Sequence, residues 1–197
     1  MNTELMLDVG QANEIKLALR REGGWSNEEI KMLTERKGLL TQVREVVLGR
    51  AEIKATEYIV DFGKSPSIPN GWSILPDAEQ LPNRVKGVMK FDPTKVRLHL
   101  DNGQKDGKWI EGNKLREKLA DVSVYGAQLG DFYLANPHLI PEEWKGKAVF
   151  LWGTIYRHSG GRLYVRCLFW DGGEWVWRYD WLARDWFSIN PAAASAS

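Results

Sequence analysis

Few residues of this sequence have the types and spacing that catalysis or metal binding requires. The three histidines, His99, His138 and His158, lie far apart, and none has a second histidine at catalytic or metal-ligand spacing. We expect them to be structural or exposed to solvent. The single Cys167 lies on an apolar stretch with nothing beside it that would lower its thiol pKa. It is expected to be buried and unreactive.

The carboxylate pair Glu142–Glu143 could in principle exchange protons, but adjacent side chains point apart on most backbones. The pair is better explained as a loop or as the start of a helix. The glycine-rich stretches lack the strand–loop–helix context of a phosphate site, and no nucleophile with a base and an orienting group is visible. We therefore expect no enzyme: no catalytic residue, no metal and no cofactor.

A tryptophan-rich segment near the end of the chain is the most informative feature. Five of the ten tryptophans lie in it: Trp170, Trp175, Trp177, Trp181 and Trp186. On the predicted strand there, Val176, Arg178 and Asp180 share one face and are apolar, cationic and anionic in turn. A buried face would not tolerate this mixture, so this face is expected to be exposed, with Trp175, Trp177 and Trp181 facing the core.

The residues between the tryptophans are predicted to form a displayed ligand-binding surface on a tryptophan scaffold. Its members are Asp171, Val176, Arg178, Tyr179, Asp180, Ala183, Arg184, Phe187, Ser188 and Ile189, with Tyr179 at the edge. A mixed surface on a rigid aromatic frame is how adaptable binding surfaces are built. A broad surface of this kind suits a protein ligand better than a small molecule. We expect a monomer that binds a protein.

The elements that must position this surface follow from periodicity and turn residues. Three N-terminal helices are expected: Asn13–Arg21, a second opened by the capping box Ser26/Glu29, and Leu39–Val47. The other expected elements are strands at Glu57–Phe62, Lys95–Leu100, Ala148–Tyr156, Leu163–Trp170 and Glu174–Trp181, and helices at Asn113–Leu119 and Ala127–Leu134.

Residues 73–90 are expected to be irregular, and the loop 137–147 is expected to bury Leu139, Ile140 and Trp144. The small-residue tail 191–197 is expected to fray. Helices followed by an irregular middle and a β-meander indicate an α+β chain, with a helical segment 1–54 and a second domain 55–197.

Composition is typical of a globular protein, with 43% apolar residues, 27% charged residues and a net charge of +1. This balance speaks against a nucleic-acid coat. No stretch approaches the roughly 20 apolar residues of a membrane span, so no membrane partner is expected. The N-terminus lacks the basic and apolar regions of a signal peptide. We expect a cytoplasmic protein, with surface display by another route left open.

The segment that runs from LWGTIYRHSGGRLYVRCLFWDGG to DWFSINPAAASAS resembles the C-terminal end of the variable proteins of diversity-generating retroelements. The versions most similar to it are the cytosolic type found in uncultured archaea and small-genome bacteria. The likeness extends to IPNGW, KFDPTKVRLHL, IEGNKLREKL and HLIPEEWKGK, which together span most of the chain after about residue 50.

This resemblance implies a C-type lectin-like fold that displays varied side chains on one face, with a variable region at about 169–190. In the family, a reverse transcriptase copies a template with errors at adenines, and the copy replaces the variable coding sequence. Calcium-dependent sugar binding is not carried over, because the disulfide cysteines are missing and Asn190–Pro191 alone is no sugar-binding signature. The family's sulfatase-maturing oxidase relatives need more cysteines than the one present.

The genetic code provides a separate check. An AAC codon randomised at both adenines becomes NNC, which never encodes Trp, Lys, Glu, Gln or Met. The reachable set includes Tyr and Ala, and it contains these seven displayed residues: Val176, Arg178, Asp180, Arg184, Phe187, Ser188 and Ile189. Tryptophan codons contain no adenine and would stay fixed. Glu174 departs from the pattern, since it cannot come from AAC.

An alternative is a DNA-binding regulator that uses the N-terminal helices and a C-terminal sensing domain. Between Glu14 and Glu45, however, seven cations are balanced by six carboxylates, whereas DNA binders usually have a clearly basic face. This balance favours a packing or interaction role for the helices, and nucleic acid is not the expected partner.

Overall fold

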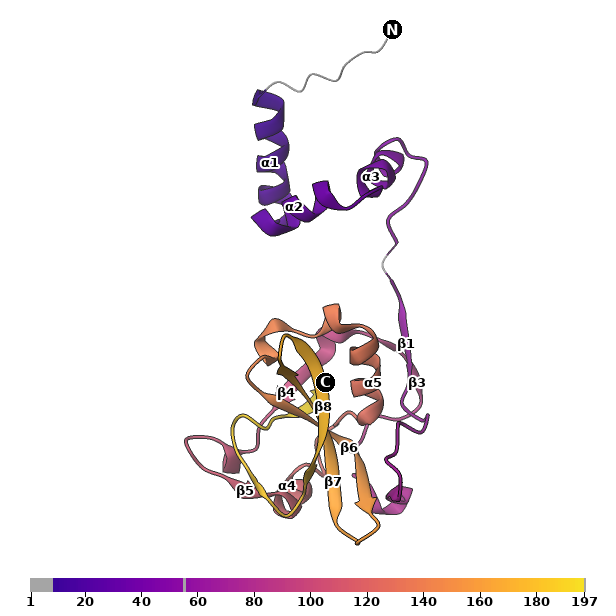
Figure 1. The fold of residues 1–197 in the computed structure, drawn as a ribbon, viewed down its shortest axis with the longest axis vertical. Helices are drawn as coiled ribbons and strands as arrows, with labels where there is room; N and C mark the ends of the chain where they lie inside the picture. The colour runs from indigo at the N-terminus through magenta and orange to yellow at the C-terminus, as the bar shows by residue number, and fades with distance from the viewer. Residues whose placement is uncertain (1–8, 55, 197) are drawn as a thin grey trace. The chain divides into compact units, whose positions relative to one another are not determined.

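The computed structural model describes residues 9–54 and 56–196, and the chain has an α+β structure (Figure 1). It divides into two compact units, Met1–Thr56 and Glu57–Ser197, which are described separately below.

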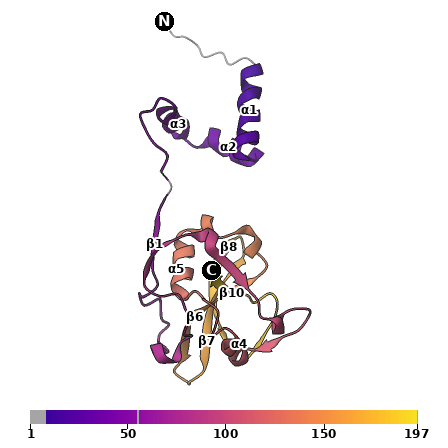
Figure 2. The same cartoon turned by 180° about the vertical axis from the view of Figure 1, so that it is seen from behind.

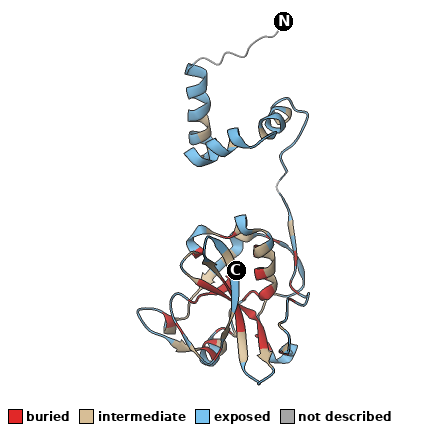
Figure 3. Cartoon of the chain, viewed as in Figure 1, coloured by how far each residue is buried: buried red, intermediate tan, exposed pale blue. Residues whose placement is uncertain are grey.

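The first unit contains three helices, α1 (Val9–Gly23), α2 (Asn27–Glu35) and α3 (Leu39–Val47). The predicted capping box is confirmed: the Glu29 amide donates to Ser26 Oγ at 3.2 Å, and the Ser26 amide donates to Glu29 Oε2 at 2.7 Å. None of the described residues of these helices is buried (Figure 3). These helices therefore gain little stability from the burial of an apolar face.

The second unit contains the elements β1 (Tyr58–Asp61), β2 (Trp72–Ile74), β3 (Val88–Phe91), β4 (Val96–His99), β5 (Ile110–Glu111), α4 (Gly112–Lys118), α5 (Ala127–Ala135), β6 (Ala148–His158), β7 (Leu163–Asp171), β8 (Glu174–Trp181), β9 (Asp185–Trp186) and β10 (Ala192–Ser195). Short 3-10 helices lie at Asp77–Glu79, Pro93–Lys95, Asn102–Gln104, Pro137–Leu139 and Glu142–Trp144.

The main sheet has the strand order β4-β10-β6-β7-β8, with β2 also paired to β6. The predicted meander is confirmed as β6, β7 and β8, which are antiparallel neighbours. The region 73–90 is more regular than expected, because Val88–Phe91 pairs with β1 and Trp72–Ile74 pairs with β6. These pairings involve residues distant in sequence, which a local pattern does not reveal.

The expectation that the C-terminal tail frays is wrong. Residues 192–195 form β10, which is antiparallel to β4 and parallel to β6 (Figure 2). Ala192, Ala193 and Ala194 are 3%, 0% and 0% exposed. The Ala193 carbonyl also accepts a hydrogen bond from the Tyr125 amide at 2.9 Å. Alanine fits here because the strand is covered on both faces and leaves room only for small side chains.

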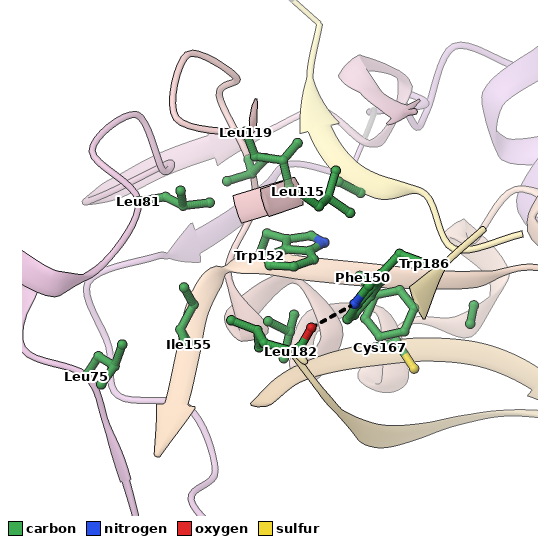
Figure 4. Packing of buried hydrophobic residues seen from close by; sticks show 14 residues of the cluster. Leu75, Leu81, Leu115, Leu119, Phe150, Trp152, Ile155, Cys167, Leu182 and Trp186 are labelled. Carbon is green, nitrogen blue, oxygen red and sulfur yellow. Dashed lines mark hydrogen bonds between the residues drawn. The ribbon is translucent and has the colours of Figure 1, made fainter. Parts of the chain in front are cut away.

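Two apolar clusters lie on opposite faces of the main sheet. One contains Phe150, Trp152, Leu115, Leu182 and Trp186, and Figure 4 shows the rings of Trp186 and Phe150 side by side. The other joins residues of α5 and the loop 137–147 to the opposite face of β6 and β7, through Leu129, Tyr133, Trp144, Leu151 and Leu168. The predicted burial of Ile140 and Trp144 is confirmed, while Leu139 is half-buried.

Candidate ligand-binding surface

The register between β7 and β8 fixes which side chains share a face. Val176, Arg178 and Asp180 lie opposite Phe169, Cys167 and Val165. These β7 residues all pack in or against the cluster that contains Trp186. The two strands are joined by Gly172 and Gly173, whose φ values of 55° and 94° are those that a two-residue hairpin turn requires. This turn fixes the register and therefore the face on which each β8 side chain lies.

Ion pairs link this face of β8 to the loop that follows it. Asp180 Oδ2 lies 2.7 Å from Arg184 Nη1 and 3.5 Å from Arg178 Nε. The Asp180 side chain is 17% exposed, whereas that of Arg178 is 49% exposed. Arg178 also stacks on the Phe169 ring, 4.8 Å from its centroid. The expectation that this face is exposed therefore holds for Arg178, whereas Val176 and Asp180 are half-buried.

The loop 182–190 is fixed by three buried residues at intervals of four. Leu182 is 1% exposed, Trp186 0% and Asn190 2%. The Trp186 indole donates to the Leu182 carbonyl at 3.3 Å (Figure 4), and Asn190 Oδ1 accepts from the Phe187 amide at 3.1 Å. These contacts make the loop a rigid support.

Framework residues outside the loop complete its anchoring. The buried Gln104 amide donates to the Phe187 and Asn190 carbonyls at 3.1 and 3.0 Å. β9 in the loop pairs with β5, and a side chain on Gly112 would overlap the Leu182 carbonyl and the Trp186 indole. Sequence reasoning missed Gln104 and Gly112, because neither residue type signals a loop anchor far away in the chain.

The remaining loop residues point outward. Phe187 and Ile189 are 42% and 58% exposed, Ala183 and Ser188 are exposed, and Arg184 is half-buried. The Ile189 carbonyl accepts from the Ala148 amide at 2.9 Å, and Ala148 lies opposite Phe169, which lies opposite Val176. The loop therefore leaves β8 and returns beside β6, across the sheet face that carries Val176.

Two expectations about the β8 aromatics are wrong. Trp177 and Trp181 do not face the core, since they are 43% and 42% exposed. Tyr179 is not at the edge of the displayed surface, because its parity places it on the opposite sheet face with the tryptophans. The physical reason is that β8 is the last strand of the sheet, and its outer residues receive less cover than those of β6 and β7.

The other scaffold tryptophans differ in burial. Trp186 is fully buried. Trp175, which was expected to face the core, is half-buried, and it packs edge to face on the half-buried Trp170 at 5.4 Å. Lys145 Nζ lies 4.0 Å from the Trp170 ring centroid. Asp171, at the hairpin turn, is exposed.

An aromatic cluster that the sequence did not predict lies on the tryptophan face of β8. The Tyr179 ring contacts Trp72, Tyr156 and Trp177 at centroid distances of 5.0, 4.9 and 5.2 Å. Burial raises the pKa of Tyr179. The buried Arg166 stacks 4.6 Å from the Trp177 centroid and pairs with Asp131 of α5 at 2.5 Å. Pairing of β2 with β6 brings Trp72 to this place, which no local motif reveals.

The cysteine, histidines and glutamate that were considered as catalytic or metal-binding candidates have structural surroundings. Cys167 is fully buried, and burial raises the pKa of its thiol to about 12. His158 Nδ1 accepts from the Gly160 amide at 2.9 Å, and burial lowers the pKa of His99. Glu142 begins a short 3-10 helix. Among the residues that the structure describes, no cluster of three or more His, Cys, Asp or Glu could hold a metal ion.

A pocket of about 500 Å³ lies elsewhere in the second unit, lined by residues that include Lys64, Arg84, Lys86 and Thr154. Its carboxylate, Asp77, is paired with Arg84 at 2.7 Å, and this contact lowers the pKa of Asp77. None of the displayed residues lines this pocket.

Comparison with known proteins yields no match: no protein-family model, no curated protein and no solved structure is similar to this chain at a significant level. Within residues 9–54 and 56–196, no helix has the length and apolar character needed to cross a membrane.

Proposed function

We propose that this protein is a non-enzymatic ligand-binding scaffold whose specificity resides in the displayed residues of β8 and the loop 182–190. One observation carries the proposal: in the loop, fully buried anchors alternate with exposed side chains of unrelated chemistry. Leu182, Trp186 and Asn190 hold the backbone. Of the side chains between them, Arg184 contacts two anchors, at 3.4 Å from Asn190 Oδ1 and 5.4 Å from the Trp186 ring centroid, and the others are exposed. Such a loop accepts changes at its exposed positions without loss of fold.

We further propose that the second unit has a C-type lectin-like fold and is the variable protein of a diversity-generating retroelement. Pairing of β4 with β10 supports this, because it places the last strand of the unit beside a strand that precedes α4, α5 and the meander β6–β8. The codon argument supports it too, since the seven reachable residues all lie on β8 or in the loop 182–190.

The ligand is proposed to be a protein. Arg178, Phe187 and Ile189 provide cationic and apolar contacts over a broad surface, and arginine and aromatic residues dominate protein interfaces energetically. None of the displayed residues lines the pocket of about 500 Å³ in the second unit.

The genetic part of the proposal is tested by sequencing the encoding locus. We expect a reverse-transcriptase gene and a second copy of the segment that encodes about residues 169–190. This copy should differ only where it carries adenines. A complete locus without both features would contradict diversification, although binding by the displayed surface could still be tested separately.

The binding part is tested by affinity purification with two matched proteins. One is the natural chain, and the other has the seven reachable residues reset to Asn or Ser. The reset protein should fold, as shown by circular dichroism, and should lose the ligands of the natural chain. Identical partners for both folded proteins would show that binding resides elsewhere, most simply in α1–α3.

A further inference from the structure

The outer edge of β8 has the properties of a site for strand addition. β8 is the last strand of the main sheet, with β7 on one side and no strand of the described chain on the other. At eight residues, Glu174–Trp181, it is long enough to pair with a short extended peptide.

The hydrogen-bond parity of β8 shows which backbone groups face this edge. The Leu182 amide donates to the Leu163 carbonyl at 2.9 Å, continuing the register in which Tyr164 lies opposite Trp181. In an antiparallel pair the bonded residues alternate, so the even-numbered residues of β8 direct their N–H and C=O groups toward β7. The odd-numbered residues, Trp175 to Trp181, direct theirs outward.

Most of these outward groups lack a partner. The Trp181 carbonyl accepts from the Arg184 amide at 3.3 Å, which closes that end of the edge. Within the described part of the chain, no hydrogen bond reaches the outward N–H and C=O groups of Trp175, Trp177 and Tyr179. Three consecutive outward residues thus present a ready template for another strand.

The two faces of β8 carry side chains of different chemistry. The odd residues place Trp175, Trp177 and Tyr179 on one face, and the even residues place Val176 and Arg178 on the other. A strand added at the edge would direct alternate side chains to these two faces. Its residues opposite the aromatics should be apolar, and the residue opposite the half-exposed Arg178 should be acidic.

We propose that the protein ligand binds through an extended segment that adds antiparallel to β8 over Trp175–Tyr179. This inference rests on the proposed function and names its mode of binding. The backbone edge and the side chains of Trp175 and Trp177 would be the same whatever residues occupy the even positions. They supply affinity common to all variants, and the even positions and the loop supply specificity. Strand addition generally divides affinity and specificity in this way.

The test uses the whole chain and a capped synthetic peptide, Thr-Thr-Val-Glu-Val-Thr-Thr. With the glutamate opposite Arg178, the valines lie opposite Trp177 and Tyr179, and their N–H groups point at β8. N-methylation of both valines should therefore weaken binding about tenfold or more, because two hydrogen bonds are lost. N-methylation of the glutamate, whose N–H points away from β8, should leave affinity unchanged.

Two protein variants test the charge contact. Arg178→Glu should reverse the preference, so that a peptide with lysine in place of glutamate binds more tightly. The matched control is Arg97→Glu on β4, the other edge of the same sheet, which should leave both affinities unchanged. Amide hydrogen exchange should show new protection at the odd residues 175–179, and the even residues should be protected already.

The proposal is overturned if no peptide binds with a Kd below about 1 mM, or if the two methylated peptides bind equally. The outcomes also separate it from the proposed function. Loss of natural ligands by the reset protein, without peptide binding at β8, would sustain the function and refute strand addition. Peptide binding with the predicted methylation pattern, together with unchanged ligands of the reset protein, would do the opposite.

Discussion

Identical residue types have different roles in this protein according to the strand and face on which they lie. Trp186 is fully buried and holds the loop 182–190, while Trp177 and Trp181 are more than 40% exposed at the sheet edge. The difference arises from how completely other side chains cover each tryptophan ring. Trp186 packs against Phe150 and Trp152 at centroid distances of 4.2 and 4.8 Å. Trp177 contacts the Arg166 cation and the Tyr179 ring and leaves the rest of its ring exposed.

Truncation of neighbouring loop residues to alanine should therefore change the free energy of unfolding by very different amounts. Trp186→Ala removes a fully buried ring and its hydrogen bond to Leu182, and should lower the free energy of unfolding by about 3–5 kcal/mol. Phe187→Ala, at a side chain 42% exposed, should change it by about 0.5 kcal/mol or less. Chemical denaturation of both variants provides the measurement, and a reversed order would mean that the loop's inner and outer faces are misassigned.

Cys167 should make stability depend on alkaline pH. Burial raises the pKa of its thiol from 9.0 to about 12, so the folded chain keeps a proton that the unfolded chain releases. Stability from this group is complete below about pH 9 and is lost as the pH rises through about 12. Denaturant titrations of the natural chain and of Cys167→Ala should show a steeper fall for the natural chain. Equal slopes would contradict the burial of the thiol.

At the scale of elements, the prediction from sequence was strongest where periodicity is local. The capping box Ser26/Glu29 and the alternation in β6–β8 lie within short windows, so the sequence predicted them. β10 was missed because an alanine run has no alternation to read, and its identity as a strand depends on the distant β4 and β6.

The same limits apply to the displayed surface. Parity predicted correctly that Val176, Arg178 and Asp180 share a face, because parity is a local property of a strand. It did not predict which face is covered more completely. That depends on α5 and on Trp72, which reach β8 only through tertiary packing.

β10 gives a direct test of the element arrangement. A chain ending at Pro191 lacks β10, which lies between β4 and β6 in the main sheet. Without this strand the second unit should no longer unfold cooperatively. A chain ending at Ser195 keeps all of β10 and should melt close to the natural chain. Thermal melts followed by near-ultraviolet circular dichroism make the comparison. A folded Pro191-terminated chain would refute the central placement of β10.

At the scale of the whole molecule, the two units are built on different principles. The helices of the first unit bury none of their described residues, while the second has two apolar clusters on either side of its sheet. Ion pairs such as Lys31–Glu35 and Arg50–Glu45 intersperse opposite charges along α2 and at the end of α3. Such mixed charge does not resemble the basic face by which proteins bind DNA phosphates.

The second unit concentrates tolerance to change in one region. Its displayed positions lie on an edge strand and on a loop whose anchors are Leu182, Trp186 and Asn190. Framework contacts from Gln104 and Gly112 reach these anchors and do not depend on the side chains between them. This separation of anchors from displayed residues is the central claim for the protein.

Selection from two matched libraries tests that claim most directly. One library places NNC codons at eight of the displayed positions, Val176, Arg178, Asp180, Ala183, Arg184, Phe187, Ser188 and Ile189. The other carries the same eight NNC codons and also places NNC codons at the three anchors Leu182, Trp186 and Asn190, so it always replaces Trp186. Both are panned against one unrelated folded protein, and binding clones are counted. We predict binders from the first library and none from the second. No binders from the first, or equal numbers from both, would contradict the account.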